Sequence, residues 1–205
     1  MWLYGTGRGL LAILYRTLYR VRAEGLENIP PTGGVILCGN HFTAHDPIMV
    51  GVCANRPVQF MAKEELFRNR FLGFIMRGVG AFPVKRGQPD RAALKRSIDV
   101  LQSGGCFGIF PEGTRNRSGK LAKPEPGTAY LALKSGAPVV PVGITSTYKL
   151  FSPVIVKFGK PMSMERYAGA KLTSELLDEV GHTIMAGIGA ELVPPVHLDV
   201  AAGKE

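Results

Sequence analysis

Six short, largely apolar runs, each bounded by turn residues, constrain the fold of this 205-residue chain more than any other feature. The first covers residues 35–38, and its continuous apolar character is typical of a strand that is buried on both faces. The others lie at 58–61, 81–84, 107–110, 139–144 and 154–158. Helical patterns separate most of them, at 48–54, 65–76, 91–101 and 127–134, and a last one covers 178–192. This alternation predicts an α/β fold with a mixed, largely parallel central sheet flanked by helices.

The N-terminal segment, residues 2–22, has the pattern of an amphipathic helix, and no acidic residue precedes Glu24. Its apolar face carries Leu3, Leu10, Leu14, Leu18 and Val21, with Arg16 and Arg20 nearly opposite. Glycines at positions 5, 7 and 9 weaken the first turns, so we expect the helix to begin near Arg8. Such a helix either lies in the interface of an anionic membrane or docks on the protein's own core. The sequence leaves both alternatives open.

The chain is basic, with 25 Lys and Arg against 16 Asp and Glu and a formal net charge of +9. An excess of this size suits a nucleic acid, an anionic membrane or an anionic substrate. Residues 56–96 hold ten basic and three acidic residues, and so carry most of the excess. This stretch lacks the interleaved arginines and aromatic residues of single-strand binders, and it contains no recognition helix or zinc finger. We therefore exclude a nucleic-acid partner.

The cysteines and the apolar runs bear on the compartment. Cys38, Cys53 and Cys106 have spacings that fit neither a disulfide framework nor a zinc site, so we expect buried thiols in a reducing cytosol. The N-terminus lacks the cleavage pattern of a signal peptide. No apolar run reaches the roughly 18 to 20 residues that a membrane span requires. We expect the protein to contact a membrane from one side only.

His41 and Asp46 lie in the connection between the first buried run and the helix that follows it. A carboxylate at this spacing can hold one imidazole nitrogen and leave the other free to accept a proton. The pair has no nucleophile of its own, so the proton would come from a substrate hydroxyl. Taken alone, a His–Asp pair is more often a hydrogen-bonded loop pair than a catalyst, and both alternatives stay open at this point.

Other chemistries fit the same stretch less well. His45 could join His41 and Asp46 in a metal site, but the next histidines are His182 and His197, in the C-terminal helix and tail. A serine hydrolase would need a Gly-x-Ser-x-Gly elbow, which does not occur. The glycines at 5, 7 and 9 precede any strand, so they do not form a dinucleotide loop. We expect neither a bound metal nor a cofactor.

At two further points an expected strand ends in a turn that contains Lys or Arg side chains. Residues 110–119 hold Glu112, Gly113, Thr114 and Arg115, and residues 80–86 end in Lys85 and Arg86. Backbone donors at a glycine turn, with a guanidinium nearby, suit a phosphate ester. Each turn taken alone also fits a solvated loop.

Together these segments resemble the family of glycerophosphate and lysophosphatidate acyltransferases. Four family motifs are matched, by Asn40, His41 and Asp46, by Gly80, Phe82 and Arg86, by the complete Phe-Pro-Glu-Gly-Thr-Arg at 110–115, and by Val140 with Pro141. The likeness runs from about residue 25 to residue 158. Thr43 stands where many members have Ser, and the turn at 123–127 is longer than usual.

The resemblance implies that His41 deprotonates the sn-2 hydroxyl of a lysophosphatidate while Asp46 orients the imidazole, with no covalent acyl-enzyme. In the family, the arginines of the second and third motifs hold the phosphate. The substrate-binding residues that we expect here are Lys63, Arg86, Glu112, Gly113, Thr114 and Arg115. Glu112 could instead order its turn. The acyl donor, acyl-CoA or acyl carrier protein, is a co-substrate.

The residue patterns and the resemblance together predict an organisation and a location. We expect a membrane-interface helix at residues 1–24 and an acyltransferase domain at 25–205, with its core motifs at 35–145. The protein would be peripheral, at the cytoplasmic face of an anionic cell membrane. An enzyme of the same fold acting on glycerol 3-phosphate or another lysophospholipid, a non-catalytic lipid-binding adaptor, and a metal-dependent phosphoesterase remain as alternatives.

Overall fold

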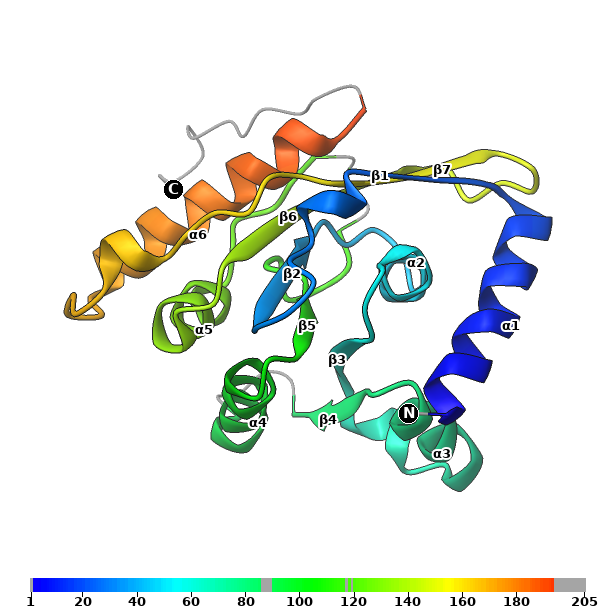
Figure 1. Ribbon diagram of the computed structural model, residues 1–205, viewed down its shortest axis with the longest axis horizontal. Coiled ribbons are helices and arrows are strands. Elements are labelled where there is room, and N and C mark those ends of the chain that lie inside the picture. The colour runs from blue at the N-terminus through cyan, green and yellow to red at the C-terminus, as the bar shows by residue number, and fades with distance from the viewer. Residues whose placement is uncertain (1, 86–89, 117, 119, 194–205) are drawn as a thin grey trace.

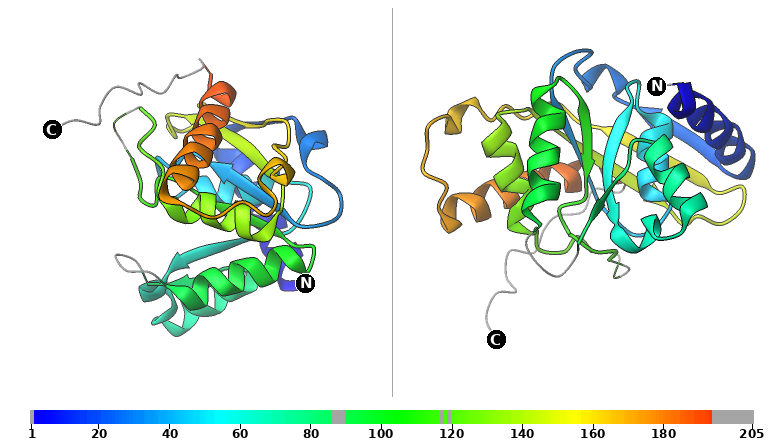
Figure 2. Two further views of the ribbon diagram at one scale, coloured as in Figure 1. Left: turned by 90° about the vertical axis from the view of Figure 1, so that its left-hand side faces the viewer. Right: turned by 90° about the horizontal axis from the view of Figure 1, so that it is seen from below.

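The computed structural model describes residues 2–85, 90–116, 118 and 120–193, which form a seven-stranded sheet with helices on both faces (Figures 1 and 2). The strand order is β1 (Arg20–Glu24), β7 (Pro153–Phe158), β6 (Val139–Ser146), β2 (Val35–Gly39), β5 (Cys106–Ile109), β3 (Val58–Lys63) and β4 (Phe82–Val84). The strands from β6 to β4 are parallel, and β7 is antiparallel to β6 but parallel to β1. The predicted α/β fold class is confirmed.

Helices cover each face of the sheet, as Figure 1 shows. One face carries α1 (Trp2–Leu18) and α2 (Asp46–Cys53), and α3 (Arg70–Gly78) lies against α1. The other face carries α4 (Arg91–Gln102), α5 (Pro126–Ser135) and α6 (Ser174–Glu191). Three short 3-10 turns are η1 (Leu26–Asn28), η2 (Glu64–Phe67) and η3 (Glu165–Tyr167). None of the helices formed by the described residues is long and apolar enough to cross a membrane.

The central strand β2 explains why the apolar runs are continuous. Val35 and Leu37 pack with α1 and α2, whereas Ile36 and Cys38 pack with the helices of the opposite face. All five residues of β2 are buried. Each large apolar side chain buried in this way contributes about 1.5–3 kcal/mol, so a strand of a two-sided sheet needs no polar residue at all.

The N-terminal segment differs from the prediction at both ends. The helix begins at Trp2 rather than near Arg8, because contacts with the core outweigh the low helix propensity of its glycines. The Tyr4 hydroxyl accepts a hydrogen bond from Val58 N–H at 2.9 Å, and the Arg8 guanidinium donates to the carbonyl of Ala54 at 2.5 Å. The helix ends at Leu18, and residues 20–24, predicted to continue it, form β1 against β7.

A second difference lies at 65–76, where one helix was predicted. The structure divides this segment into η2 and α3, which are separated by Arg68 and Asn69. The side chain of Asn69 accepts a hydrogen bond from Leu72 N–H at 2.9 Å, which caps the start of α3. The other predicted strands and helices are present, with ends that differ by a few residues.

Candidate active site

Four parallel strands end at one edge of the sheet, and the candidate site residues follow those ends. His41 comes directly after β2, and the turn that begins at Phe110 comes after its neighbour β5. Lys63 is the last residue of β3, and Lys85 follows β4. The carboxyl ends of parallel strands are where α/β proteins bind their ligands, so the topology brings these motifs to one place.

The loop between β2 and α2 folds around the carboxylate of Asp46. Nδ1 of His41 lies 3.0 Å from Oδ2 of Asp46, and the backbone N–H groups of Phe42 and Thr43 donate to the same oxygen at 2.7 and 2.6 Å. The Thr43 hydroxyl donates to Oδ1 at 3.0 Å. Asp46 is fully buried and His41 is 7% exposed. Because Nδ1 faces the carboxylate, Nε2 is the nitrogen left for proton transfer, and no described residue hydrogen-bonds to it.

Aromatic rings hold the imidazole of His41 from its face. The Phe110 ring stacks on it with centroids 4.3 Å apart and planes inclined by 20°. Phe60 of β3 stacks in turn on Phe110, at 6.1 Å and 12°. Gly108 of β5 makes room for this row of rings, because a Cβ there would overlap the ring of Phe60. Stacking on Phe110 therefore fixes the plane of the His41 ring, and the hydrogen bond from Nδ1 to Asp46 fixes its rotation within that plane.

Glu112 fastens the turn after β5 to His41. Its Oε1 accepts the backbone N–H of His41 at 2.9 Å. Its Oε2 accepts from the side chain of Asn116 at 3.0 Å and from Ala122 N–H at 3.1 Å. In return, Asn116 N–H donates to the carbonyl of His41 at 2.7 Å. A buried carboxylate with three donors orders its surroundings, and a substrate contact for Glu112 stays a prediction.

The same residues appear in a known family. The sequence model of the family described as Acyltransferase matches residues 20–145, more than half of the 205 residues. The chain belongs to this acyltransferase family. The matched region contains the His41–Asp46 pair, both basic turns and the Val140–Pro141 dipeptide of β6.

Relatives in the acyltransferase family are called 1-acyl-sn-glycerol-3-phosphate acyltransferase. The chain is 34% identical to that of Borreliella burgdorferi, over 67% of this chain and 56% of the relative, and 32% identical to that of Bacillus subtilis, over 72% and 76%. The crystal structure of the 1-acyl-sn-glycerophosphate acyltransferase PlsC of Thermotoga maritima is similar, with a TM-score of 0.70 and 27% identity, covering 91% of this chain and 76% of that one. The match thus spans little more than half of the Borreliella protein.

The expected substrate-binding residues of this acyltransferase lie at the same edge of the sheet. Gly113, Thr114 and Arg115 are exposed in the turn that Glu112 fastens to His41. Gly113 has φ 65°, a left-handed conformation that favours glycine. Lys63 is half exposed and forms an ion pair with Glu65 at 3.1 Å. Arg86, the other predicted phosphate ligand, lies outside the described residues.

Two tyrosines near the dyad were not expected from the sequence. The Tyr148 hydroxyl, beyond the end of β6, donates to Oδ1 of Asp46 at 2.9 Å. Tyr15 of α1 is hydrogen-bonded to Nδ1 of His45 at 2.6 Å, so His45 has a partner of its own. Burial raises the pKa of both tyrosines, and the nearby Asp46 charge adds to this. Tyr148 follows β6, and its proximity to Asp46 becomes clear only once the strand order, in which β6 lies beside β2, is known.

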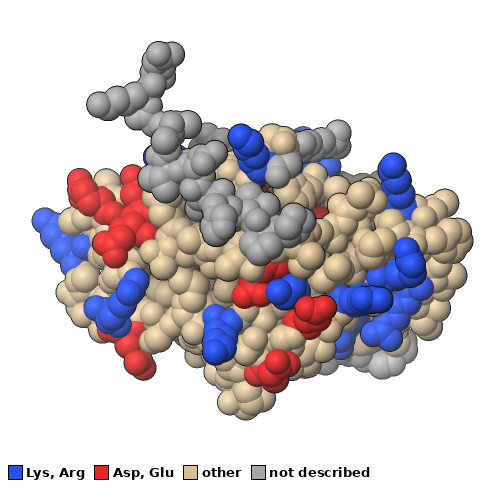
Figure 3. All heavy atoms as spheres, turned by 90° about the horizontal axis from the view of Figure 1, so that it is seen from above, with Lys and Arg blue, Asp and Glu red and all other residues tan. Residues whose placement is uncertain are grey.

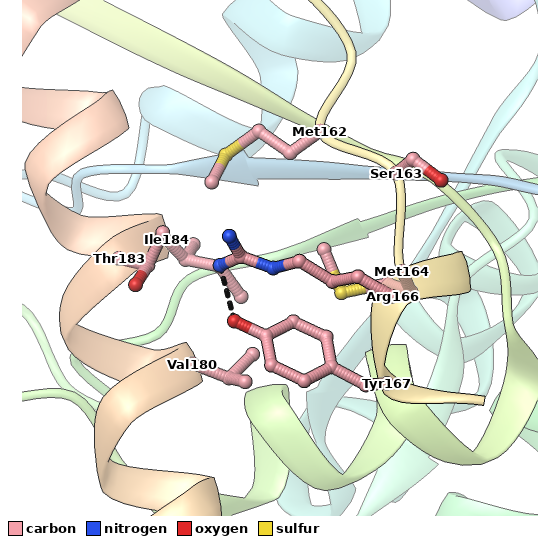
Figure 4. A pocket seen from close by; sticks show the side chains of 8 residues that line it. All are labelled: Met162, Ser163, Met164, Arg166, Tyr167, Val180, Thr183 and Ile184. Carbon is pink, nitrogen blue, oxygen red and sulfur yellow. Dashed lines mark hydrogen bonds between the residues drawn. The ribbon is translucent and has the colours of Figure 1, made fainter. Parts of the chain in front are cut away.

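One hollow lies beside this edge of the sheet, and a second lies away from it. One, of about 310 Å³, is at the end of β4 and start of α4, where Lys85 and Arg96 line it. The other, of about 220 Å³, lies between η3 and α6, and Figure 4 shows Arg166 bonded to Tyr167 within it. Neither element of the second hollow contributes to the dyad. Among the described residues, no three His, Cys, Asp or Glu side chains are grouped to hold a metal ion.

Proposed function

We propose that the protein transfers a fatty acyl group from an acyl thioester to the sn-2 hydroxyl of 1-acyl-glycerol 3-phosphate, forming phosphatidate. The observation that carries this proposal is the His41–Asp46 pair, buried, oriented at 3.0 Å and placed at the ligand-binding edge of an acyltransferase fold. A protein that only binds lipid needs no such base. The names of the Borreliella, Bacillus and Thermotoga relatives support the choice of acceptor.

In this reaction, Nε2 of His41 removes the proton of the sn-2 hydroxyl as that oxygen attacks the thioester carbonyl carbon. The imidazolium that forms faces the buried carboxylate of Asp46, which stabilises its charge. When the carbon–sulfur bond breaks, the thiol leaves with the proton that His41 returns. The acyl group passes directly to the acceptor, so no residue of the chain needs to be acylated.

The acceptor phosphate is assigned to the exposed cations at the strand ends. Arg115 lies in the turn whose next residue, Asn116, donates to the backbone of His41, so a phosphate on Arg115 keeps the glycerol close to the imidazole. Lys63 lies on β3, which pairs with β5 beside that turn. A guanidinium binds a phosphate by two parallel hydrogen bonds, and a lysine adds a point charge. Arg86 completes the proposed set.

A membrane surface is the proposed location, since both substrates carry acyl chains. Leu10 and Ile13 of α1 are 71% and 67% exposed, and Phe71 of the neighbouring α3 is 75% exposed. Further exposed apolar side chains close to these helices are Leu14, Phe74, Leu150 and Phe151. Figure 3 shows Lys and Arg side chains gathered toward the end of the molecule that carries α1. Apolar side chains rimmed by cations fit an anionic bilayer, here the cytoplasmic face of the cell membrane.

The opposite face of α1 is docked on the core. Tyr15 of the helix and Tyr19, which directly follows it, are buried in the core, and Leu11 and Leu18 pack against it. The two alternatives for this helix are therefore compatible, since α1 has one docked face and one exposed apolar face. On this basis the helix is part of the folded protein that lies on the bilayer, and it adds Tyr15 to the surroundings of the dyad.

The experiment that tests the proposal is an acyl-transfer assay with purified protein and labelled lysophosphatidate. Acyl-CoA and acyl carrier protein are supplied in parallel as donors, and glycerol 3-phosphate and lysophosphatidylcholine are added as competing acceptors. We expect labelled phosphatidate with at least one donor. Preferred acylation of glycerol 3-phosphate or lysophosphatidylcholine would overturn the assignment of lysophosphatidate as the acceptor. Absence of acyl transfer with every pair of donor and acceptor would overturn the proposed function.

A further inference from the structure

Tyr148 connects the dyad to a distant part of the chain. Among the described residues, Asp46 accepts hydrogen bonds from the His41 ring, from Phe42 N–H, from the N–H and hydroxyl of Thr43, and from the Tyr148 hydroxyl. All but the last come from the loop that holds Asp46 itself. Tyr148 is 102 residues away in the sequence. Its hydroxyl therefore links the carboxylate of Asp46 by a hydrogen bond to the segment that follows β6.

The backbone at Tyr148 is held in an unfavourable conformation. Its φ is 50°, in the left-handed region that side chains other than glycine rarely adopt. The Ser146 hydroxyl supports this turn, since it accepts from Tyr148 N–H at 2.9 Å and donates to the carbonyl of Pro153 at 3.2 Å. A strained turn of this kind persists only where the surroundings enforce it, and here it delivers one hydroxyl to Asp46.

The ring of Tyr148 is packed on two sides. Its centroid lies 5.1 Å from that of His45 and 5.7 Å from that of Tyr19, with the Tyr19 ring edge-on at 87°. Burial and the charge of Asp46 raise the pKa of Tyr148 above its usual value, so the phenol is protonated at neutral pH. At neutral pH the hydroxyl is therefore available as a donor, and the two neighbouring rings restrict its position.

We propose that Tyr148 is a positioning residue, which holds Oδ1 of Asp46 so that Oδ2 stays opposite Nδ1 of His41 during acyl transfer. This inference rests on the proposed function. The terminal torsion of an aspartate has a broad energy well, so a carboxylate held from one side can swing. Thr43 and Tyr148 bind Oδ1 from two directions and fix its plane. A fixed carboxylate stabilises the transition state, because His41 becomes positively charged there and Oδ2 of Asp46 is already in place beside it.

The first test replaces Tyr148 by Phe, which keeps the ring and removes the hydroxyl. Because Tyr148 does not contact the acceptor in this account, kcat should fall about tenfold, the size expected for losing a hydrogen bond to a charged group. KM for lysophosphatidate and for the acyl donor should stay within about twofold. Tyr167→Phe, which also deletes a hydrogen-bonded hydroxyl but lies in η3, whose hydroxyl bonds Glu179 of α6, should leave both parameters unchanged.

A double-mutant cycle with Asp46→Asn separates positioning from a general loss of structure. If Tyr148 acts through the carboxylate, Tyr148→Phe should have no further effect on the residual kcat of Asp46→Asn. An additional tenfold loss in that background would overturn the proposal. So would an unchanged kcat in the single variant, or an unfolded Tyr148→Phe protein, which would make the hydroxyl a structural group. A wild-type protein without acyl-transfer activity would instead refute the proposed function.

Discussion

Nδ1 of His41 lies 3.0 Å from Oδ2 of Asp46, and the two groups are buried at the point where β2 ends. This contact decides which imidazole nitrogen can act on a substrate. It also depends on other parts of the chain, because Glu112 holds the backbone of His41 and Tyr148 holds the second oxygen of Asp46.

Asp46→Asn should lower both activity and stability. The new amide group would present a donor to Phe42 N–H, Thr43 N–H or the Tyr148 hydroxyl, which need an acceptor. We expect kcat to fall at least a hundredfold and the free energy of unfolding to fall by about 1–3 kcal/mol. Steady-state kinetics and urea denaturation measure the two effects. The control is Asp99→Asn, which removes an exposed ion pair with Lys95 and should change neither. Equal effects of the two variants would contradict the role of Asp46.

Arg115→Ala should weaken binding of the phosphorylated acceptor. The side chain is exposed, so its loss should leave the thermal unfolding temperature unchanged. KM for lysophosphatidate should rise about tenfold or more, with a smaller change in KM for the acyl donor. Lys134→Ala, in the last turn of α5, removes the same unit of charge and serves as the control. An acceptor KM that stays the same would remove Arg115 from the site.

Membrane binding should depend on the exposed face of α1. Deleting the helix would also remove Tyr15 from the core and Leu11 and Leu18 from its edge, so point substitutions are the sharper test. Leu10→Ser, Ile13→Ser and Leu14→Ser together should reduce binding to anionic vesicles more than a hundredfold, since each buried apolar side chain contributes about 1.5–3 kcal/mol. Vesicle co-sedimentation measures this, with Val193→Ser as the exposed apolar control. Retained binding of the triple variant would place the membrane contact elsewhere.

The three thiols should be unreactive in the folded protein. Burial raises the pKa of Cys53 to about 11 and that of Cys106 to about 12, and burial also raises the pKa of Cys38. At pH 8 a thiol reagent should therefore label the native chain very slowly and all three thiols in denaturant. Because the unfolded thiols ionise near pH 9 and the folded ones do not, the free energy of unfolding should decrease as the pH rises from about 9 to 12. Rapid labelling at pH 8 would contradict this burial.

The sequence predicts much of this fold because strands buried on both faces leave continuous apolar runs. It fails at β1, where Arg20, Arg22 and Glu24 alternate with small apolar residues at the edge of the sheet and resemble the end of the preceding helix. The dyad is predictable because its residues are five apart in one loop. Tyr148 and Tyr15 are not, since only the strand order β6-β2-β5 and the docking of α1 bring them to Asp46 and His45.

The most direct test of the central claim is the turnover of His41→Ala in the lysophosphatidate assay. We predict that kcat falls at least about a hundredfold, as is typical when a general base is lost, while the thermal unfolding temperature and vesicle binding stay close to those of the wild type. A His41→Ala protein that forms phosphatidate at the wild-type rate would contradict the proposed mechanism.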